Sequence, residues 1–466
     1  MIERTGMHGL PNVYRSSGLL KKMFWLITTL FAFVFLIWQV TKAIMFYYSY
    51  PTTTKFQLHS SPSLPFPAVS FCNLNPIRSE LIENAGPSLK GLLKGKESNR
   101  NGTITKKPTS FFDWNDTDSS EEDNVYSVNS QFLEYYSTLP KKSRIDLGYN
   151  ITNTLLACSI EGKKCGPKDF KLFNNYFYGL TLTLFIDQSQ YIKEIAESAG
   201  IQLVVHDPTD MPFPEDKGVA ISPGKLSFIG FQLKVSNNLS PPYGICNNFS
   251  KLENQNVNAF WNELSNISYT EEACMRTCYQ KRVISRCDCA DPRYNFHSST
   301  FKSSVEPCKR SNTTQTHCKD KVELEFSRNS QLCQTECPAE CVKNIFEIRE
   351  SHAQWPSLPK TGDIIDLLQM KNEVIYNRLK DFTNEKRETF VSQNVLKVHV
   401  YYSSLTFLKI SREATYQTTS LLSDLGGQVG LWLGFSVITI FEFFELALDS
   451  SILLFLKCKT ANKKQF

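Results

Sequence analysis

The residues best suited to chemistry lie near the end of the sequence, in a long apolar stretch. Gly430 and Gly434 stand beside Ser436. Three acidic residues follow them: Glu442, Glu445 and Asp449. A cation that sheds part of its water shell needs oxygen ligands, which backbone carbonyls at a helix break and a serine hydroxyl can supply. The acidic residues would attract cations if they face the same axis. By spacing alone, Gly430 and Gly434 fit a role in close packing between helices better than a role in lining a pore.

Two apolar segments are long enough to hold such groups in a bilayer, which requires about 20 apolar residues in a helix. The first spans 23–46, with Trp25 and Trp38 near its ends, and Lys42 interrupts it. The second spans 421–456 and carries the glycines and acids described above. A cleaved signal peptide fits the first segment poorly, because 22 residues precede it and no small-residue cleavage site follows. The rival interpretation of the second segment is a buried amphipathic helix.

Basic residues flank both segments on the sides that face the chain ends. They are Arg4, Arg15, Lys21, Lys22, Lys457, Lys459, Lys463 and Lys464. The positive-inside rule places both termini in the cytoplasm. We therefore expect cytoplasmic ends at 1–22 and 457–466, and an extracellular domain at 47–420.

Cysteines and glycosylation sequons support this orientation. Thirteen of the 14 cysteines lie between Cys72 and Cys341. Seven Asn-x-Ser/Thr sequons fall in the same region: Asn101, Asn115, Asn150, Asn238, Asn248, Asn266 and Asn312. Together these features are typical of an oxidising, extracellular compartment, where disulfides form. The alternative is a zinc site at Cys287 and Cys289 with His297 or His317.

The middle region mixes strand and helix patterns, so we expect an α+β extracellular domain. Alternating apolar residues predict strands at 68–72, 227–235 and 395–408. Helices are predicted at 262–282 and 361–386, and an irregular insertion at 88–122. The mild net charge of +5 gives no reason to expect nucleic acid binding. The seven histidines are scattered and no catalytic motif is present, so we expect neither an enzyme nor a cofactor.

Four ordered motifs resemble those of the epithelial sodium channel, degenerin and acid-sensing ion channel family. They are His8-Gly9, the stretch FPAVSFCN at 66–73, PPYGIC at 241–246, and GGQVGLWLGFS at 426–436. The resemblance implies a membrane protein with two transmembrane helices and a disulfide-rich extracellular domain of palm, finger, thumb and knuckle type. It implies a finger-like insertion at about 86–165, a thumb-like region at about 246–345, and a selectivity filter at Gly434, Phe435 and Ser436.

The resemblance also implies six disulfides. The pairs are Cys158–Cys165, Cys246–Cys341, Cys274–Cys337, Cys278–Cys333, Cys287–Cys318 and Cys289–Cys308. The chain departs from the family pattern at Thr181, where the usual partner of Cys72 would stand. We therefore expect Cys72 to be unpaired or to form an intersubunit bond.

Several positions match the family's gating elements. Tyr50 and Tyr243 match two aromatic residues that touch at the junction with the first span. Ser420 matches a position where a bulky residue holds the pore open, and Asp424 follows one turn later. His8 and Gly9 match a cytoplasmic gating motif.

The expected function is a sodium-selective, amiloride-sensitive channel subunit of the plasma membrane, assembled as a homo- or heterotrimer. The expected trigger is an extracellular neuropeptide. Proton gating and constitutive activity remain alternatives, and Glu121, Glu122 and Asp123 are the candidate proton-sensing residues. An alternative from another class is a non-conducting, two-span glycosylated receptor.

Overall fold

The computed structural model describes residues 10–84, 86–94, 131–167, 179–246, 267–294, 305–328, 331–371 and 373–434, and single residues 436, 439, 441, 444, 445, 448, 451 and 452. The chain divides into two compact units. Unit 1 comprises residues 1–55, 241–244 and 412–466, and unit 2 comprises residues 56–240 and 245–411.

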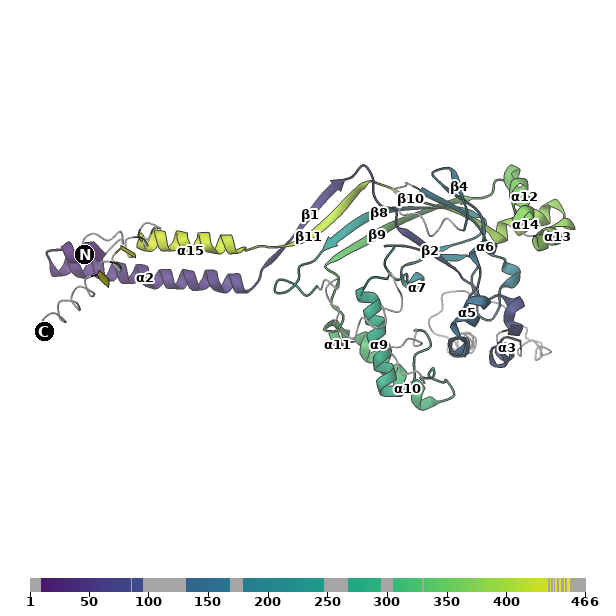
Figure 1. Ribbon diagram of the computed structural model, residues 1–466, viewed down its shortest axis with the longest axis horizontal. Helices are drawn as coiled ribbons and strands as arrows, with labels where there is room; N and C mark the ends of the chain where they lie inside the picture. The colour runs from purple at the N-terminus through teal and green to yellow at the C-terminus, as the bar shows by residue number, and fades with distance from the viewer. Residues whose placement is uncertain are drawn as a thin grey trace, which may run out of the picture. The chain divides into compact units, whose positions relative to one another are not determined.

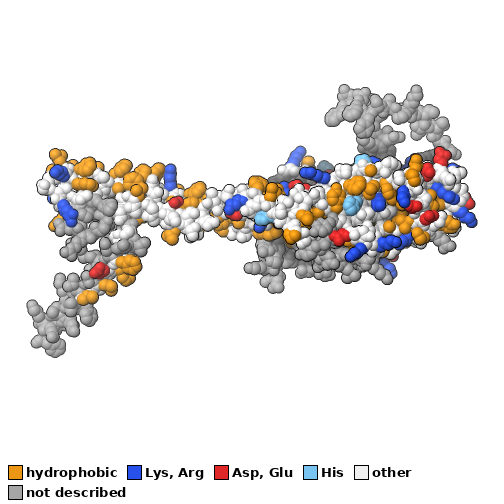
Figure 2. Space-filling view, turned by 90° about the horizontal axis from the view of Figure 1, so that it is seen from above, with side chains coloured by type: hydrophobic (Ala, Val, Ile, Leu, Met, Phe, Trp, Pro, Cys, Tyr) orange, Lys and Arg blue, Asp and Glu red, His pale blue; other side chains and the backbone are white. Residues whose placement is uncertain are grey.

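Unit 1 is built from α1 (Leu10–Arg15), α2 (Leu19–Tyr48) and α15 (Thr418–Leu433). The 30 residues of α2 extend over about 45 Å at 1.5 Å per residue. Leu36 alone is buried among them. Trp25, Phe35 and Val40 are half-buried, and most of the other apolar side chains are exposed (Figure 2). Among the described residues, α2 is the one helix long and apolar enough to cross a membrane. The predicted second span at 421–456 lies partly outside the described residues.

The strands form two β-sheets, which belong to unit 2 except for the first residues of β1 and the last residues of β11 (Figure 1). The larger has the order β1-β11-β8-β10-β5-β3-β4, with β9 paired to β8. Its strands are β1 (Thr52–Ser60), β3 (Leu155–Ile160), β4 (Lys163–Cys165), β5 (Gly179–Phe185), β8 (Lys225–Asn237), β9 (Val342–Gln354), β10 (Val395–Tyr402) and β11 (Thr406–Ala414). The smaller sheet joins β2 (Ala68–Asn73), β6 (Ile201–His206) and β7 (Val219–Ile221). The observed β2 and β8 confirm the predicted strands at 68–72 and 227–235.

The main core lies on one face of the larger sheet. Leu396, Val398 and Val400 alternate along β10 and are fully buried, as the period of two for a half-buried strand requires. Phe231 on β8 lies at the centre, with its ring 4.4 Å from that of Tyr402 and 5.5 Å from that of Phe66. Burying one such side chain stabilises the fold by about 1.5–3 kcal/mol, so the central strands hold the unit together.

Short helices surround the sheets. They are η1 (Ser79–Asn84), α3 (Pro87–Lys94), α5 (Lys141–Leu147), α6 (Ile151–Thr154), η4 (Gln188–Gln190), α7 (Pro214–Lys217), α9 (Glu271–Cys287), α10 (Thr313–Arg328), α11 (Gln331–Gln334), η6 (Leu358–Lys360), α12 (Thr361–Lys371), α13 (Glu373–Lys380) and α14 (Asn384–Asn394).

Three predicted elements were wrong in extent. The helix predicted at 361–386 ends early, because Thr383 leaves the helical conformation and its hydroxyl caps the new helix α14 by accepting from the amide of Lys386. The strand predicted at 395–408 is two strands, β10 and β11, separated by a turn at residues 403–405. The helix predicted at 262–282 begins later, at Glu271, and continues to Cys287.

The predicted irregular insertion at 88–122 begins within a helix instead. Residues 87–94 form α3, whose Leu89 is buried against Ile77 and Ile82. The remainder of the insertion, including Glu121, Glu122 and Asp123, lies outside the described residues.

Six disulfides occur in unit 2. They join Cys158–Cys165, Cys246–Cys341, Cys274–Cys337, Cys278–Cys333, Cys287–Cys318 and Cys289–Cys308. These pairs coincide with those that the family resemblance implied. Since Cys287 and Cys289 are both oxidised, neither provides a thiolate, and the alternative of a zinc site there is wrong. Cys72 is exposed and has no disulfide partner among the described cysteines.

Candidate pore and gating elements

Helix α15 carries the glycines that predict the pore, and it ends where the filter was predicted. Gly434 follows Leu433 in the left-handed conformation, with φ 65° and ψ 25°. Its amide still donates to the carbonyl oxygen of Gly430, at 2.9 Å. A residue with a side chain would be strained in this conformation, so glycine is the natural terminator. The backbone therefore leaves the helix at the first residue of the Gly-Phe-Ser triplet.

Ser436 and Thr439 cap the chain beyond this break. The amide of Ser436 donates to Thr439 Oγ1 at 3.2 Å, and the amide of Thr439 donates to Ser436 Oγ at 3.4 Å. Their hydroxyl oxygens lie 3.2 Å apart. This reciprocal arrangement resembles a capping box, in which two residues three apart satisfy each other's free amides. Sequence reasoning named Ser436 but missed Thr439, although the spacing Ser-x-x-Thr was visible.

Helices α2 and α15 contact each other within unit 1 through a polar and an aromatic group. The indole Nε1 of Trp432 donates to Gln39 Oε1 at 3.1 Å, and its ring centre lies 4.7 Å from that of Phe35. Gln39 stands within a mostly apolar helix, where an unpaired amide would be costly. Sequence reasoning missed this pair, for which the lone glutamine of the first span was the available signal.

Aromatic residues gather where α2 ends. Tyr50 has φ 48°, an uncommon value for a residue with a side chain, and its ring lies edge-on to Tyr243 at 5.2 Å. Tyr47 contacts the Tyr50 ring at 6.5 Å, and its hydroxyl lies 3.2 Å from that of Thr418. Edge-to-face contacts at such distances are favourable. The structure thus brings Tyr50 and Tyr243 together, as the family resemblance implied.

The start of α15 has a second link to this aromatic group. The hydroxyl of Tyr416 donates to the carboxylate of Asp424, and the ring of Tyr416 lies 5.2 Å from that of Phe46. Ser420 lies in the first turn of α15, one turn before Asp424. One tyrosine therefore connects the end of α2 with an acidic residue of the candidate pore helix.

For the other predicted site residues, the structure gives only their position, exposure or one hydrogen bond, or does not describe them. Glu445 is exposed, and Gly430 lies in the last turn of α15. Several predicted residues lie outside the described part of the chain: His8, Gly9, Phe435, Glu442, Asp449, and the sequons Asn101, Asn115, Asn248 and Asn266. Of the other sequons, Asn150 and Asn312 are exposed. Asn238 is half-buried, and its Nδ2 donates to the carbonyl of Glu340 at 3.1 Å.

The thumb-like region contains a buried charge that sequence reasoning missed. Asp291 is 1% exposed and receives hydrogen bonds from Arg293 Nη2 at 2.7 Å and from the Tyr279 hydroxyl at 3.0 Å. Burial alone would raise the pKa of Asp291, but the bonds and charge of Arg293 outweigh it and lower the pKa. The paired charges and the disulfides on α9 and α10 make this region rigid.

A second acidic residue has the opposite environment. Asp210 lies beside His206, Glu340 and Lys343 around a cavity of about 40 Å³. Burial, together with the carboxylates of Asp207 and Glu340, raises the pKa of Asp210 to about 6. No feature of the sequence near Asp210 indicated this shift.

Comparison with known proteins agrees with this architecture. A family model described as amiloride-sensitive sodium channel matches residues 1–446. The chain is similar to the gamma subunit of the epithelial sodium channel of Neoceratodus forsteri, with 24% identity over 96% of this chain and 81% of the relative. The alpha subunit of the same organism is 24% identical over 96% of this chain and 78% of the relative. Degenerin unc-8 of Caenorhabditis elegans is 30% identical over 69% of this chain and 42% of the relative. The match covers unit 2 and the candidate pore helix α15, and the chain belongs to the amiloride-sensitive sodium channel family.

Proposed function

We propose that the chain is one subunit of a ligand-gated, sodium-selective and amiloride-sensitive cation channel of the plasma membrane. The observation that carries the proposal is the end of α15 at Gly434, followed by the capped Ser436. Within a bilayer, non-helical backbone is tolerated only where it lines a cavity or is buried in protein. A break at this depth can present carbonyl oxygens to a hydrated cation.

In the proposed topology, residues 23–46 and 421–456 cross the bilayer and both termini lie in the cytoplasm. Helix α2 supports the first span, because its exposed apolar side chains need a hydrocarbon environment. Glu442, Glu445 and Asp449 would then attract cations at the inner mouth. Similarity to alpha and gamma subunits of a multisubunit channel supports assembly with copies or relatives of this chain, as a homo- or heterotrimer.

The proposed trigger is an extracellular peptide. The candidate proton-sensing cluster at 121–123 lies in an acid run of the kind that is usually solvated surface, which favours a ligand other than protons. Protons are the alternative trigger, and Asp210 is the described residue that favours it because its pKa lies near 6. Constitutive activity is the remaining alternative.

Cysteine accessibility tests the pore directly. Because Cys72 is exposed and unpaired, a background with Cys72→Ser and Cys458→Ser is prepared first. Single cysteines are then introduced from Leu433 to Phe441, and current is recorded during exposure to an aqueous thiol reagent. We expect block at several positions and protection by amiloride. Phe31→Cys on α2 is the matched control and should not react, because Phe31 faces lipid in the proposed topology.

The trigger is tested by recording from cells that express the chain alone or with related subunits. Amidated peptides and acid are applied separately. Activation by peptide supports the proposal, activation by acid alone favours the proton alternative, and amiloride-blocked current without a stimulus indicates constitutive activity. Absence of current with every partner, combined with unreactive cysteines at all positions, would favour the non-conducting receptor.

A further inference from the structure

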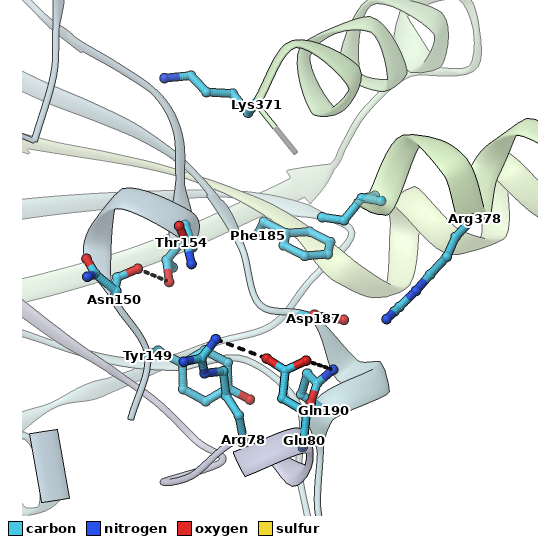
Figure 3. Close-up of a pocket in the computed structure, with 12 residues that line it drawn as sticks. Arg78, Glu80, Tyr149, Asn150, Thr154, Phe185, Asp187, Gln190, Lys371 and Arg378 are labelled. Atoms are coloured by element: carbon cyan, nitrogen blue, oxygen red, sulfur yellow. Dashed lines mark hydrogen bonds and ion pairs between the residues drawn. The ribbon is translucent and has the colours of Figure 1, made fainter. Parts of the chain in front are cut away.

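A cavity in unit 2 has the size and lining of a ligand site. Its volume is about 400 Å³, within the range of small-molecule pockets. Its lining residues come from four parts of the chain: 78–80, 149–154, 185–190, and Lys371 together with 375–378. Figure 3 shows Arg378 reaching from α13 toward Asp187, with the ring of Phe185 above them and Arg78 beside Glu80. None of these residues belongs to the pore or to the gating contacts described above.

One wall of the cavity is held rigidly by its own hydrogen bonds. Gln190, which is buried, accepts from the amide of Glu80 at 3.0 Å and from the Ser79 hydroxyl at 3.1 Å. Glu80 in turn pairs with Arg78, with Nη1 and Oε1 3.1 Å apart. Buried Asn75 donates to the carbonyl of Gln190 at 3.0 Å and so fixes the wall from behind. The acceptors of this wall are therefore largely occupied.

The groups that remain without partners are mostly donors. The Nε of Arg78 is buried and has no acceptor in the described structure. The hydroxyl of Tyr149 accepts from Asn75 at 2.8 Å, and no described group accepts its own proton. Burial raises the pKa of Tyr149, so the proton stays on the oxygen at neutral pH. Two buried or half-buried donors thus lack acceptors, and such groups usually have one in a complete assembly.

The charges around the cavity favour an anion. Three basic residues, Arg78, Lys371 and Arg378, face two acidic ones, Glu80 and Asp187. Arg378 donates through Nη1 to the hydroxyl of Ser189 at 2.8 Å, and Ser189 donates to Asp187 at 2.5 Å. Among the described side chains, neither Arg378 nor Lys371 has a carboxylate within ion-pair distance. The guanidinium of Arg378 therefore keeps most of its donors for another acceptor.

The remaining lining is apolar. Phe185 is 4% exposed and Ile375 is 3% exposed, and both belong to a buried cluster. A cavity of this volume is far larger than a chloride ion, so an occupant must also cover the apolar wall. A carboxylate joined to an aromatic or aliphatic group satisfies both requirements, since it brings acceptors to the donors and apolar surface to Phe185.

We propose that this cavity binds a small organic anion, whose carboxylate is held by Arg378, Arg78 and Tyr149 and whose apolar part packs on Phe185 and Ile375. Such a ligand would join α13 to the η1 and η4 segments. Binding therefore stabilises whichever arrangement of these segments is complementary to the anion. The binding itself does not depend on the proposed channel activity, whereas an effect on current rests on it.

The test uses the full-length protein, purified in lipid nanodiscs and treated with an endoglycosidase so that no large glycan on Asn150 covers the rim. Benzoate and phenylacetate are the probes, and benzamide is the neutral control. Binding is measured by calorimetry and by the shift in the thermal unfolding midpoint. We expect saturable binding of the carboxylates and at least about tenfold weaker binding of the amide, because hydrogen bonds to charged groups contribute about 1.5–3 kcal/mol.

Variants locate the site. Arg378→Gln should weaken carboxylate binding about tenfold or more, and Phe185→Leu should weaken it while leaving the preference over benzamide. Lys386→Gln is the matched control, because Lys386 is an exposed cation on α14 outside the lining. Failure of both carboxylates to bind the wild type, equal binding of benzamide, or unchanged binding by Arg378→Gln would each overturn the proposal. Because none of these measurements uses current, a silent channel does not affect the result.

Discussion

At the scale of single residues, the candidate filter depends on hydroxyl groups as much as on glycine. Thr439 is 3% exposed and exchanges hydrogen bonds with Ser436 across the break after α15. Thr439→Val keeps the shape of the side chain but removes the hydroxyl, so Ser436 loses its fixed position. We expect the sodium-to-potassium permeability ratio to fall by up to about tenfold, since one hydrogen bond contributes about 0.5–1.5 kcal/mol. Reversal potentials after exchange of external sodium for potassium measure the ratio.

Thr439→Ser is the control for this prediction, because it retains the hydroxyl and should retain selectivity. A valine variant that reaches the cell surface with the wild-type permeability ratio would show that the contact between Ser436 and Thr439 has no role in selecting the ion.

Asp210 leads to a prediction about pH. Its pKa is about 6 in the folded protein against an ordinary value of 3.8. Between about pH 4 and pH 6 the folded state binds more protons than the unfolded state, so the free energy of unfolding falls as the pH rises. The contribution of protonated Asp210 to stability is therefore fully present below about pH 4 and is lost as the pH rises through 6. Asp210→Asn should remove this loss and raise the thermal midpoint at neutral pH. Midpoints of the purified protein across this pH range provide the measurement.

The nearby charges around Asp210 are Asp207, Glu340, Lys217 and Lys343. Asp381→Asn, which changes an exposed aspartate of unit 2, is the matched control and should preserve the wild-type pH profile. If Asp210→Asn left the slope between pH 4 and 6 unchanged, another group would be responsible for it.

Sequence reasoning succeeded for residues in motifs that resemble those of the family, including the distant pairs Tyr50–Tyr243 and Cys246–Cys341, and it failed for contacts outside those motifs. Gly434, the cysteines and the aromatic pair all belong to short motifs that can be recognised without knowledge of the fold. By contrast, Gln39 meets Trp432 across 393 positions, and Asp291 is defined by burial under α9 and α10. No periodicity reports such contacts, because they arise when separate elements pack together.

At the scale of elements, periodicity identified the type of element better than its ends. The helix was predicted at 361–386 from apolar residues on one face, of which Leu368, Ile375 and Leu379 pack in one buried cluster. The chain nevertheless leaves the helical conformation before α14, where Thr383 caps the new helix and Phe382 packs against the same cluster. The apolar pattern therefore concealed this break, whereas Thr383 was a cap signal that could have been used.

The contact between α2 and α15 can be tested at the same scale. Gln39→Leu removes the acceptor at 3.1 Å but leaves Trp432 its second bond, to Gln428 at 3.2 Å. We therefore expect a small effect, about 0.6 kcal/mol, as is typical for a hydrogen bond between membrane helices. Trp432→Ala should do more, because it also removes the ring contact with Phe35. The thermal unfolding midpoints of the two purified variants in nanodiscs show which substitution lowers stability more.

Trp432→Phe distinguishes the two contributions, because it retains a ring against Phe35 but has no donor. It loses both hydrogen bonds, to Gln39 and to Gln428, so it should be less stable than Gln39→Leu but more stable than Trp432→Ala. A Trp432→Ala protein as stable as the wild type would mean that this contact does not hold the two helices together.

At the scale of the whole molecule, both units expose surface that requires further partners. In unit 1, nearly all of α2 is exposed and apolar, which a bilayer accounts for. All nine residues of the edge strand β1 are exposed, including Phe56 and Leu58 of unit 2. Exposed apolar edge strands are a risk for aggregation unless another chain covers them. The family's oligomeric assembly would supply that cover, and the sequence alone identified the family but not this surface.

The proposed trimer leads to a prediction about Ser420, which lies in the first turn of α15. In that trimer, copies of α15 would approach one another around the axis. If closure brings these turns together, a serine leaves room for it. Ser420→Phe adds a ring that prevents the approach, so we expect amiloride-blocked current without any ligand, several-fold above the wild-type resting level. Ser420→Ala keeps the side chain small, so the pore of this variant should be closed at rest.

A double variant separates this obstruction from the contact between Tyr416 and Asp424, which lies one turn further along the same helix. Tyr416→Phe removes that contact. Combined with Ser420→Phe it should not close the pore again, because the obstruction lies at the axis. Unchanged resting current in Ser420→Phe at wild-type surface density would mean that α15 does not close at this turn, and the proposed gate would have to lie elsewhere along the helix.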